Sequence, residues 1–228
     1  LWGTNAADIF VGGNGDDVLL AWAGNDSLDG GGNNDVLLGN ADNDTLIGGN
    51  GDDWLWAGDG ADTVVGGEGA DVLVGDLAGL SETGSDTLVG GNGADIILGT
   101  YFGAAGNDVI WEGLDLGQSG NDLANGLGGN DLILTGIGND TIVGGTGDDS
   151  LYGESGTDTF VFGANWGNDI VWDWANGEIF DLRGSGVTAF GQLTLTAGFG
   201  GSVNVSFGSN SILVLGGSGL IDASDFLF

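Results

Sequence analysis

Aspartate recurs in this sequence every nine residues, and its carboxylates are the groups that could do chemistry. Eight aspartates follow one another without a slip from Asp8 to Asp71. Longer intervals follow, and the nine-residue spacing then returns from Asp122 to Asp158. Carboxylate oxygen is the hard ligand that Ca²⁺ and Mg²⁺ prefer. The series indicates cation binding, and its seventeen members are Asp8, Asp17, Asp26, Asp35, Asp44, Asp53, Asp62, Asp71, Asp86, Asp95, Asp108, Asp122, Asp131, Asp140, Asp149, Asp158 and Asp169.

The charge balance supports a cationic partner and excludes several function classes. The chain has 34 acidic residues and one basic residue, Arg183, so its formal net charge is −33. Binding to nucleic-acid phosphates or to anionic lipid requires Lys and Arg, so we expect neither. His, Cys and Lys are absent, which removes the usual catalytic bases and zinc ligands. We expect no enzyme, although two carboxylates alone could in principle catalyse hydrolysis.

Each aspartate lies at the sixth place of a nine-residue unit, and this unit predicts the elements that position it. A typical unit is GGNGDDWLW at 48–56. Its first six places hold Gly, Asn and Asp, which form tight turns, and its last three predict a short strand. Two units make one coil, and stacked coils form two parallel sheets. The eighth places point between the sheets and are aliphatic: Leu19, Leu28, Leu37, Leu46, Leu55, Val64, Leu73, Leu88 and Ile97.

Three units are longer than nine residues. Their extra residues lie at 76–85, 100–106 and 112–120, in the Gly-rich part of the unit. We expect these insertions to be loops on an intact scaffold.

The unit resembles the RTX (repeats-in-toxin) nonapeptide Gly-Gly-x-Gly-x-Asp-x-aliphatic-x, a calcium-binding repeat. The resemblance covers residues 3 to about 172. It implies an all-β fold, a parallel, right-handed β-roll of two sheets, with several Ca²⁺ ions between turns on the same edge of successive coils. All seventeen aspartates would be ligands, and Asp53 would pair with Asp35 and Asp71, and Asp62 with Asp44. Backbone carbonyls of the turns would complete the sites, among them those of Gly12, Asn14, Gly48, Asn50, Gly51, Gly66, Glu68 and Gly69.

The same pattern predicts that folding depends on the metal. Carboxylates about 5 Å apart repel by roughly 0.8 kcal/mol in water and about 3 kcal/mol at an effective dielectric constant of 20. Ordering 52 glycines also costs conformational entropy. We therefore expect the metal-free chain to be unfolded and calcium binding to be coupled to folding.

The outward seventh and ninth places of alternate units form a wholly apolar sheet face. These residues are Val18, Leu20, Val36, Leu38, Trp54, Trp56, Val72, Val74, Ile96 and Leu98. The intervening units, up to Val89, are mixed. Two explanations stand: the places follow β-propensity alone, or a second copy, another domain or the inserted loops cover the face. In the second case the tryptophans would anchor an interface.

Residues 1–172 are expected to form the roll, and residues 173–228 a C-terminal β cap. A strand-turn-strand pattern occupies 173–182, and hairpin strands are expected at 193–197, 203–207 and 212–217. The cap would bury the last coil, as repeat arrays require. The closing segment 220–228 is similar to the uncleaved export signal of RTX proteins, which implies recognition by type I secretion machinery.

The sequence thus predicts a secreted, extracellular bacterial protein that folds on calcium and self-associates, as a matrix, filament, surface-layer or adhesin component. It could associate with the cell surface, and no membrane insertion is expected because no apolar run is long enough. One alternative is the export-and-folding part of a larger RTX enzyme or toxin. Another is adhesion through inserted residues such as Tyr101 and Phe102.

Overall fold

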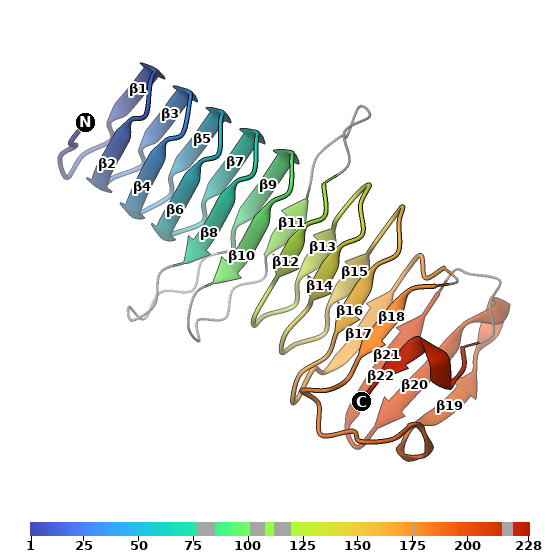
Figure 1. Cartoon of the computed structure of the whole chain (residues 1–228). Coiled ribbons are helices and arrows are strands. Elements are labelled where there is room, and N and C mark those ends of the chain that lie inside the picture. The colour runs from blue at the N-terminus through green and yellow to red at the C-terminus, as the bar shows by residue number, and fades with distance from the viewer. Residues whose placement is uncertain (77–84, 101–107, 112–119, 176, 216–220) are drawn as a thin grey trace.

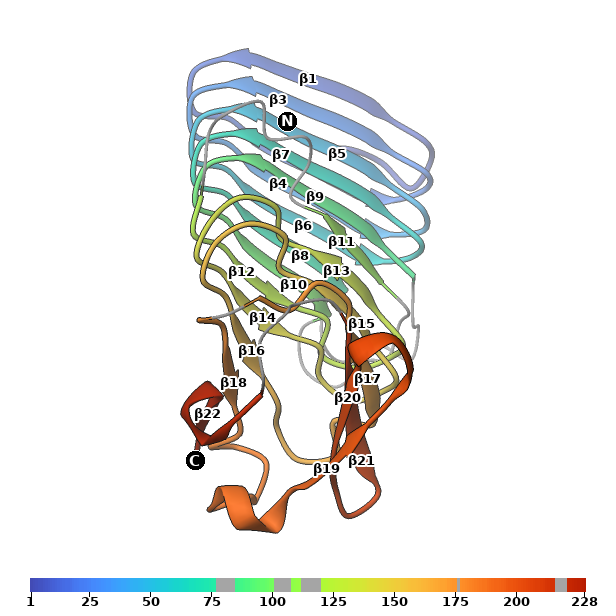
Figure 2. The same ribbon diagram turned by 90° about the vertical axis from the view of Figure 1, so that its right-hand side faces the viewer.

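The computed structural model describes residues 1–76, 85–100, 108–111, 120–175, 177–215 and 221–228. It is an all-β molecule of two sheets, in which the coils stack along one axis toward a C-terminal cap (Figures 1 and 2). The three predicted insertions fall largely on residues outside these ranges. None of the helical elements among the described residues is long and apolar enough to span a bilayer.

Odd-numbered strands form one sheet, called the odd sheet. Its order is β1-β3-β5-β7-β9-β11-β13-β15-β17-β21-β20-β19. The strand bounds are β1 Ile9–Asn14, β3 Ser27–Gly32, β5 Thr45–Asn50, β7 Thr63–Glu68, β9 Thr87–Asn92, β11 Val109–Trp111, β13 Leu132–Leu134, β15 Ser150–Tyr152, β17 Asn168–Val171, β19 Thr194–Ala197, β20 Val203–Phe207 and β21 Asn210–Val214.

Even-numbered strands form the opposite sheet, called the even sheet, in the order β2-β4-β6-β8-β10-β12-β14-β16-β18-β22. The bounds are β2 Val18–Ala23, β4 Val36–Ala41, β6 Trp54–Asp59, β8 Val72–Asp76, β10 Ile96–Thr100, β12 Leu123–Asn125, β14 Thr141–Val143, β16 Thr159–Val161, β18 Ile179–Asp181 and β22 Phe226–Leu227. Neighbouring strands of the roll pair in parallel, and Leu37 aligns with Leu55 one coil later. The predicted alternation of units between two parallel sheets is confirmed.

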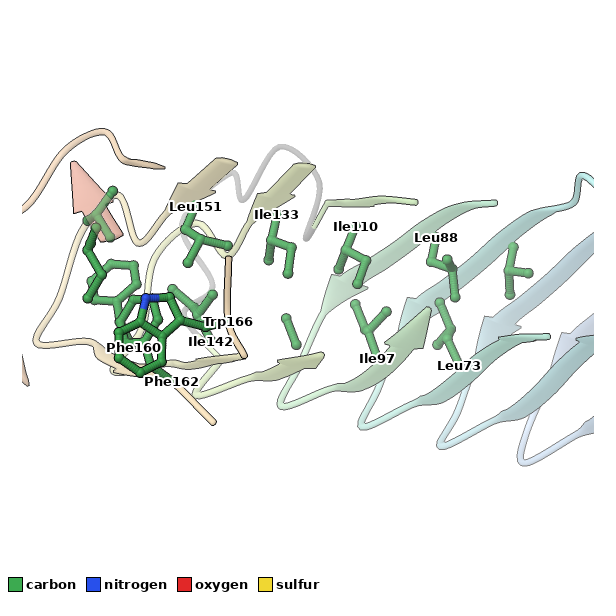
Figure 3. Packing of buried hydrophobic residues seen from close by; sticks show 14 of the residues in the cluster. Leu73, Leu88, Ile97, Ile110, Ile133, Ile142, Leu151, Phe160, Phe162 and Trp166 are labelled. Carbon is green, nitrogen blue, oxygen red and sulfur yellow. The ribbon is translucent and has the colours of Figure 1, made fainter. Parts of the chain in front are cut away.

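The core of the roll is a thin file of side chains between the two sheets, with one row from each sheet. All nine eighth-place residues predicted to lie there are fully buried. The file continues through Ile110, Ile133, Ile142 and Leu151 into an aromatic cluster around Phe160 and Trp166 (Figure 3). Leucine and isoleucine fill this space because one side chain per strand must span the gap between the sheets.

The strands of the first coils are longer than predicted. The sequence predicts three-residue strands, whereas β1 to β7 and β9 have six residues each. The extra residues are the first places of the next unit, such as Gly13 and Asn14, which align with Gly31 and Gly32 one coil later. Gly-rich turn residues therefore continue the ladder, because stacked coils present the same backbone groups to one another.

The repeat also extends further than predicted. The pattern at 173–182 does not form a hairpin, because β17 belongs to the odd sheet and β18 to the even sheet. Strand β18 pairs in parallel with β16, so that Phe160 aligns with Phe180. Glu178, which precedes β18, thus takes the sixth place of an eighteenth unit. The sequence pattern did not predict this unit because glutamate replaces aspartate at its sixth place.

The remaining C-terminal strands form the predicted cap. Strands β19, β20 and β21 are antiparallel, and β21 joins them to β17 of the roll. Three short 3₁₀ turns accompany them among the described residues: η1 Phe190–Gln192, η2 Phe199–Gly201 and η3 Ala223–Asp225. Strand β22, from the closing segment, pairs with β18 at the end of the even sheet. The division into domains at 172/173 stays a prediction.

Candidate calcium-binding columns

The seventeen aspartates lie in two columns, one along each edge of the roll. In each column, the backbone N–H of one aspartate donates to Oδ1 of the aspartate one coil further on, over 2.6–3.0 Å. The first column runs Asp8, Asp26, Asp44, Asp62, Asp86, Asp108, Asp131, Asp149 and Asp169. The second runs Asp17, Asp35, Asp53, Asp71, Asp95, Asp122, Asp140 and Asp158. Asp53 lies between Asp35 and Asp71, as predicted, while calcium ligation by these pairs stays a prediction.

The second carboxylate oxygen is the unusual feature of these columns. On many of the aspartates, Oδ2 is buried and, among the described residues, accepts no hydrogen bond. A buried carboxylate oxygen without a partner carries a large desolvation cost. Its recurrence at the same place in many coils indicates a missing positive partner. The residues concerned are Asp26, Asp35, Asp44, Asp53, Asp62, Asp71, Asp108, Asp131, Asp149, Asp158 and Asp169.

A backbone carbonyl lies close to the unpartnered oxygen. A Cβ added to Gly48 would contact Asp53 Oδ2 and would lie 2.7 Å from the carbonyl oxygen of Gly66, one coil further on. Gly30 has the same surroundings, with the Gly48 carbonyl oxygen at 2.7 Å from that point. Two acceptors that face one small space, with no donor between them, fit a hard cation that takes oxygen ligands. The residues of this chain therefore suit Ca²⁺.

Ala21 and Ala57 occupy the first place of their nine-residue units, where Gly30 and Gly48 stand in theirs, and both alanines are fully buried. The carbonyl oxygen of Ala57 lies 2.6 Å from the Cβ position of Gly39, beside Asp44. Since this oxygen comes from the backbone, alanine can supply it as glycine does.

Burial raises the pKa of several buried column carboxyls, although the backbone N–H bonds to Oδ1 oppose the shift. The pKa of Asp169 rises to about 8, and those of Asp44 and Asp131 rise to about 7. In all three, neighbouring aspartates add to the effect of burial. Ionising these columns is therefore unfavourable without a cation, and a bound divalent cation would reverse that balance.

Other carbonyls predicted as ligands are less clearly placed. The Glu68 carbonyl already accepts a hydrogen bond from Gly51 N–H (2.7 Å), and the side chain of Glu68 accepts one from Asn92. Among the described residues, no cluster of three or more acidic side chains could hold a metal by itself. Each site therefore needs backbone oxygens in addition to its pair of aspartates.

Sequence reasoning missed a second ladder, at the fifth place. Asn34 Oδ1 accepts from Asp52 N–H (3.1 Å), and Asp52 Oδ1 accepts in turn from Ala70 N–H (2.9 Å). The same pattern joins Asn121 Oδ1 to Asn139 N–H. This ladder runs in the opposite sense to that of the sixth place and ties the same turns together. Its signal was the frequent Asn and Asp at this place, which the sequence analysis had assigned only to turn formation.

The apolar outer face of the even sheet is largely as predicted. Val18, Trp54 and Ile96 are exposed, whereas Leu20, Val36, Leu38, Trp56, Val72 and Leu98 are half-buried. The two tryptophans meet edge to face, with ring centroids 5.9 Å apart. The prediction was wrong for Val74, which is only 3% exposed and so is unavailable as a surface contact.

A second apolar region was missed, on the odd sheet from β11 onward. Its outward residues are Val109, Trp111, Leu132, Leu134, Tyr152, Ile170 and Trp172, each exposed or half-buried. Tyr152 and Trp172 stack with centroids 5.7 Å apart. The signal was the same pair of outward places, followed past Val89.

No curated protein sequence is significantly similar to this chain. Among solved structures, the crystal structure of extracellular lipase LipA from Serratia marcescens matches with a TM-score of 0.42 and 17% identity. The match covers 90% of this chain and 40% of the lipase chain, so this chain spans about two fifths of that protein's length.

The model of the RTX calcium-binding nonapeptide repeat matches residues 2–37, 38–73, 81–111, 116–142 and 134–171. These matches cover well over half of the chain and include both aspartate columns. The chain therefore belongs to the RTX calcium-binding nonapeptide repeat family, and calcium ions are its cofactors.

Proposed function

We propose that this chain is a secreted structural protein that folds when calcium fills its two aspartate columns, and that then self-associates through the even sheet. The observation that carries the proposal is the repeated pairing of a buried, unpartnered Asp Oδ2 with a backbone carbonyl of the next coil. The matched family supports a calcium-binding, non-catalytic role for the roll.

Calcium would act as the link between successive coils. Asp35, Asp53 and Asp71 would contribute carboxylates, and Gly48 and Gly66 would contribute carbonyl oxygens. A bound cation removes the repulsion within a column and fixes two Gly-rich turns at once. Because these groups converge only when coils are stacked, binding free energy becomes folding free energy.

This coupling suits export. A chain that stays unfolded at low calcium can leave the cytoplasm through type I machinery and fold outside, where millimolar calcium fills weak sites. The family supports an extracellular location. We propose 1–172 as the calcium-dependent roll and 173–228 as the cap that carries the export signal, with the eighteenth unit, around Glu178, as the junction between them.

Self-association would use the even patch, defined as Val18, Leu20, Val36, Leu38, Trp54, Trp56, Val72, Ile96 and Leu98. These residues occupy five neighbouring strands, β2 to β10, and carry no charge. A contiguous apolar patch on the surface of a monomer is often functional. Trp54, half exposed at the centre of the patch, is the expected anchor.

Sedimentation over a range of protein concentrations, with calcium and with chelator, tests both parts of the proposal. We expect an unfolded monomer in chelator, and folded, concentration-dependent assemblies in calcium. The variant Trp54→Thr, Trp56→Thr should still gain β structure with calcium but remain a 22.7 kDa monomer.

A calcium-folded wild-type monomer at all concentrations would contradict self-association. It would favour the alternative, a folding-and-export module of a longer RTX enzyme or toxin. Adhesion through the inserted residues, including Tyr101 and Phe102, concerns residues that lie outside the described ranges.

A further inference from the structure

We infer that the odd sheet carries a second docking surface, and that copies of this chain join the even patch of one molecule to this odd patch of the next. The odd patch consists of Val109, Trp111, Leu132, Leu134, Tyr152, Ile170 and Trp172. The inference rests on the proposed self-association and names the partner surface and the form of the assembly.

The two patches lie on different coils of the roll. The even patch lies on the first coils, and beyond it the outward places of the even sheet become mixed, with Asn125, Thr141 and Thr159 paired on their strands with Leu123, Val143 and Val161. The odd sheet shows the reverse order, because its strands β3 to β9 are mixed, with Ser27, Asp29, Thr45, Thr63 and Thr87 alongside Ile47, Val65 and Val89. The terminal strand β1 differs, since Ile9 and Val11 are both exposed. Figure 1 shows that β2 to β10 and β11 to β17 occupy successive parts of the roll. β-Propensity alone does not explain why the wholly apolar face lies on the even sheet in the first coils and on the odd sheet in the later coils.

The absence of charged residues from both patches favours an uncharged partner surface. Neither patch contains an acidic or basic residue, although the chain carries 34 acids. Asp29 and Asp181, at ninth places of their units, both lie outside the patches. A cationic partner would therefore bind the turns, where the acids are concentrated. The patches suit another neutral apolar surface, and the molecule itself supplies one.

Side-chain size makes the patches complementary in shape. In the even patch, the large Trp54 and Trp56 stand between the smaller Val36/Leu38 and Val72 of the neighbouring strands. In the odd patch, Leu134 lies between Trp111 and Tyr152. These two aromatic residues are separated by two strand spacings, roughly 10 Å, which can admit an indole ring. The strand spacing is the same on both surfaces. The indole rings of the even patch can therefore pack between Trp111 and Tyr152 of the odd patch.

The patches lie on opposite sheets, so two molecules joined through one even patch and one odd patch cannot also join through their other two patches. After one contact forms, each molecule still presents one free patch. Such heterologous contacts produce open-ended filaments unless the rotation closes a ring. From the strand spacing, each patch covers roughly 200 Å², well below the ~800 Å² per partner of a standard stable interface. Single contacts should therefore be weak, and assembly should require high protein concentrations.

The test uses two single-patch variants of the full chain in calcium. The even-patch variant is Trp54→Thr, Trp56→Thr, and the odd-patch variant is Trp111→Thr, Leu134→Thr. Threonine already occupies outward places at 45 and 63, so it suits the strands. Ile47→Thr is the matched control, because Ile47 is exposed on the odd sheet outside both patches. Far-UV circular dichroism checks that each variant folds, and Tyr152→Thr, Trp172→Thr is a second odd-patch variant.

By sedimentation and negative-stain microscopy, the wild type and Ile47→Thr should form filaments, while each patch variant alone should be monomeric. An equimolar mixture of the two patch variants should yield a 1:1 dimer and nothing larger, because one functional patch of each kind remains. At the concentration at which the wild type forms filaments, dimers of either variant alone, a monomeric mixture, or filaments of the odd-patch variant would overturn the inference. A monomeric wild type would instead refute the self-association on which it rests.

Discussion

The roll and the cap bury different chemistry. Most roll strands contribute one aliphatic side chain to the core, and most turns bury a carboxylate. The C-terminal part instead buries aromatic rings: Phe180 contacts Phe160, Phe162, Trp174 and Phe226 with centroids 5.2–6.2 Å apart. Its aspartate Asp181 has a cationic partner within the chain, Arg183.

This difference indicates which region of the molecule depends on calcium for its stability. A one-residue-wide core buries little apolar area per coil, while the glycines of that coil lose much entropy. The cap has large rings and a satisfied ion pair. We therefore expect stability to come from calcium in the roll and from apolar burial in the cap.

Calcium removal should have the largest effect and should separate the two regions. In chelator, amide hydrogens of β1 to β10 should lose protection, while β19 to β21 should keep part of theirs. Hydrogen exchange read by mass spectrometry measures both regions in one experiment. Equal protection of the roll with and without calcium would refute the coupling of binding to folding.

The next effect concerns the aromatic cluster. Phe180→Ala should cost about 3–5 kcal/mol, since it removes a fully buried ring that four others contact. Leu55→Ala, in the core of the roll, is the matched comparison. Urea unfolding in calcium should reveal both losses, whereas in chelator only the Phe180 variant should reduce residual protection. An effect of Leu55→Ala in chelator would show that the roll retains its core without metal.

Stacking, rather than backbone conformation alone, should set the cost of substituting a turn glycine. Gly67 and Gly13 both have positive φ, 122° and 104°. A Cβ on Gly67 would contact the carbonyl oxygen of Gly49, whereas one on Gly13 would have nothing within 4 Å. Gly13→Ala should cost about 1–2 kcal/mol for its left-handed conformation, and Gly67→Ala should cost more. Equal losses in urea titrations would show that close coil stacking does not matter.

Acidification should act in opposite directions on the two regions of the metal-free chain. Burial raises the pKa of Asp169 to about 8, so its protonated form favours folding, and this contribution is lost as pH rises toward 8. The hydrogen bond from Arg183 lowers the pKa of Asp181, so its contribution is lost as pH falls. In chelator, lowering the pH from 8 to 5 should therefore increase β structure in the roll. Circular dichroism that shows no gain would contradict the raised values.

The regular part of this fold could be read from the sequence because identical units must occupy identical environments. Leu28 to Leu88 were assigned to the core from one periodicity, and the aspartates were assigned to two edges from the alternation of units. Glu178 could not be assigned because its residue type departs from the pattern while its backbone does not. The carbonyl beside Asp53 Oδ2 comes from Gly66 in another coil, so it emerges only when the register of the stack is known.

The fifth-place ladder should give the smallest effect, and it tests whether neutral hydrogen bonds add to the calcium columns. Asn34→Ala removes an acceptor for Asp52 N–H in an exposed turn. A single neutral hydrogen bond contributes about 0.5–1.5 kcal/mol, and water can replace this one. Asn34→Asp is the matched control, because it keeps the acceptor and matches Asp16 and Asp52 at the same place. Calcium-dependent urea unfolding should rank wild type and Asn34→Asp above Asn34→Ala by about 1 kcal/mol. If Asn34→Ala equals the wild type, the aspartate columns alone hold the turns in register.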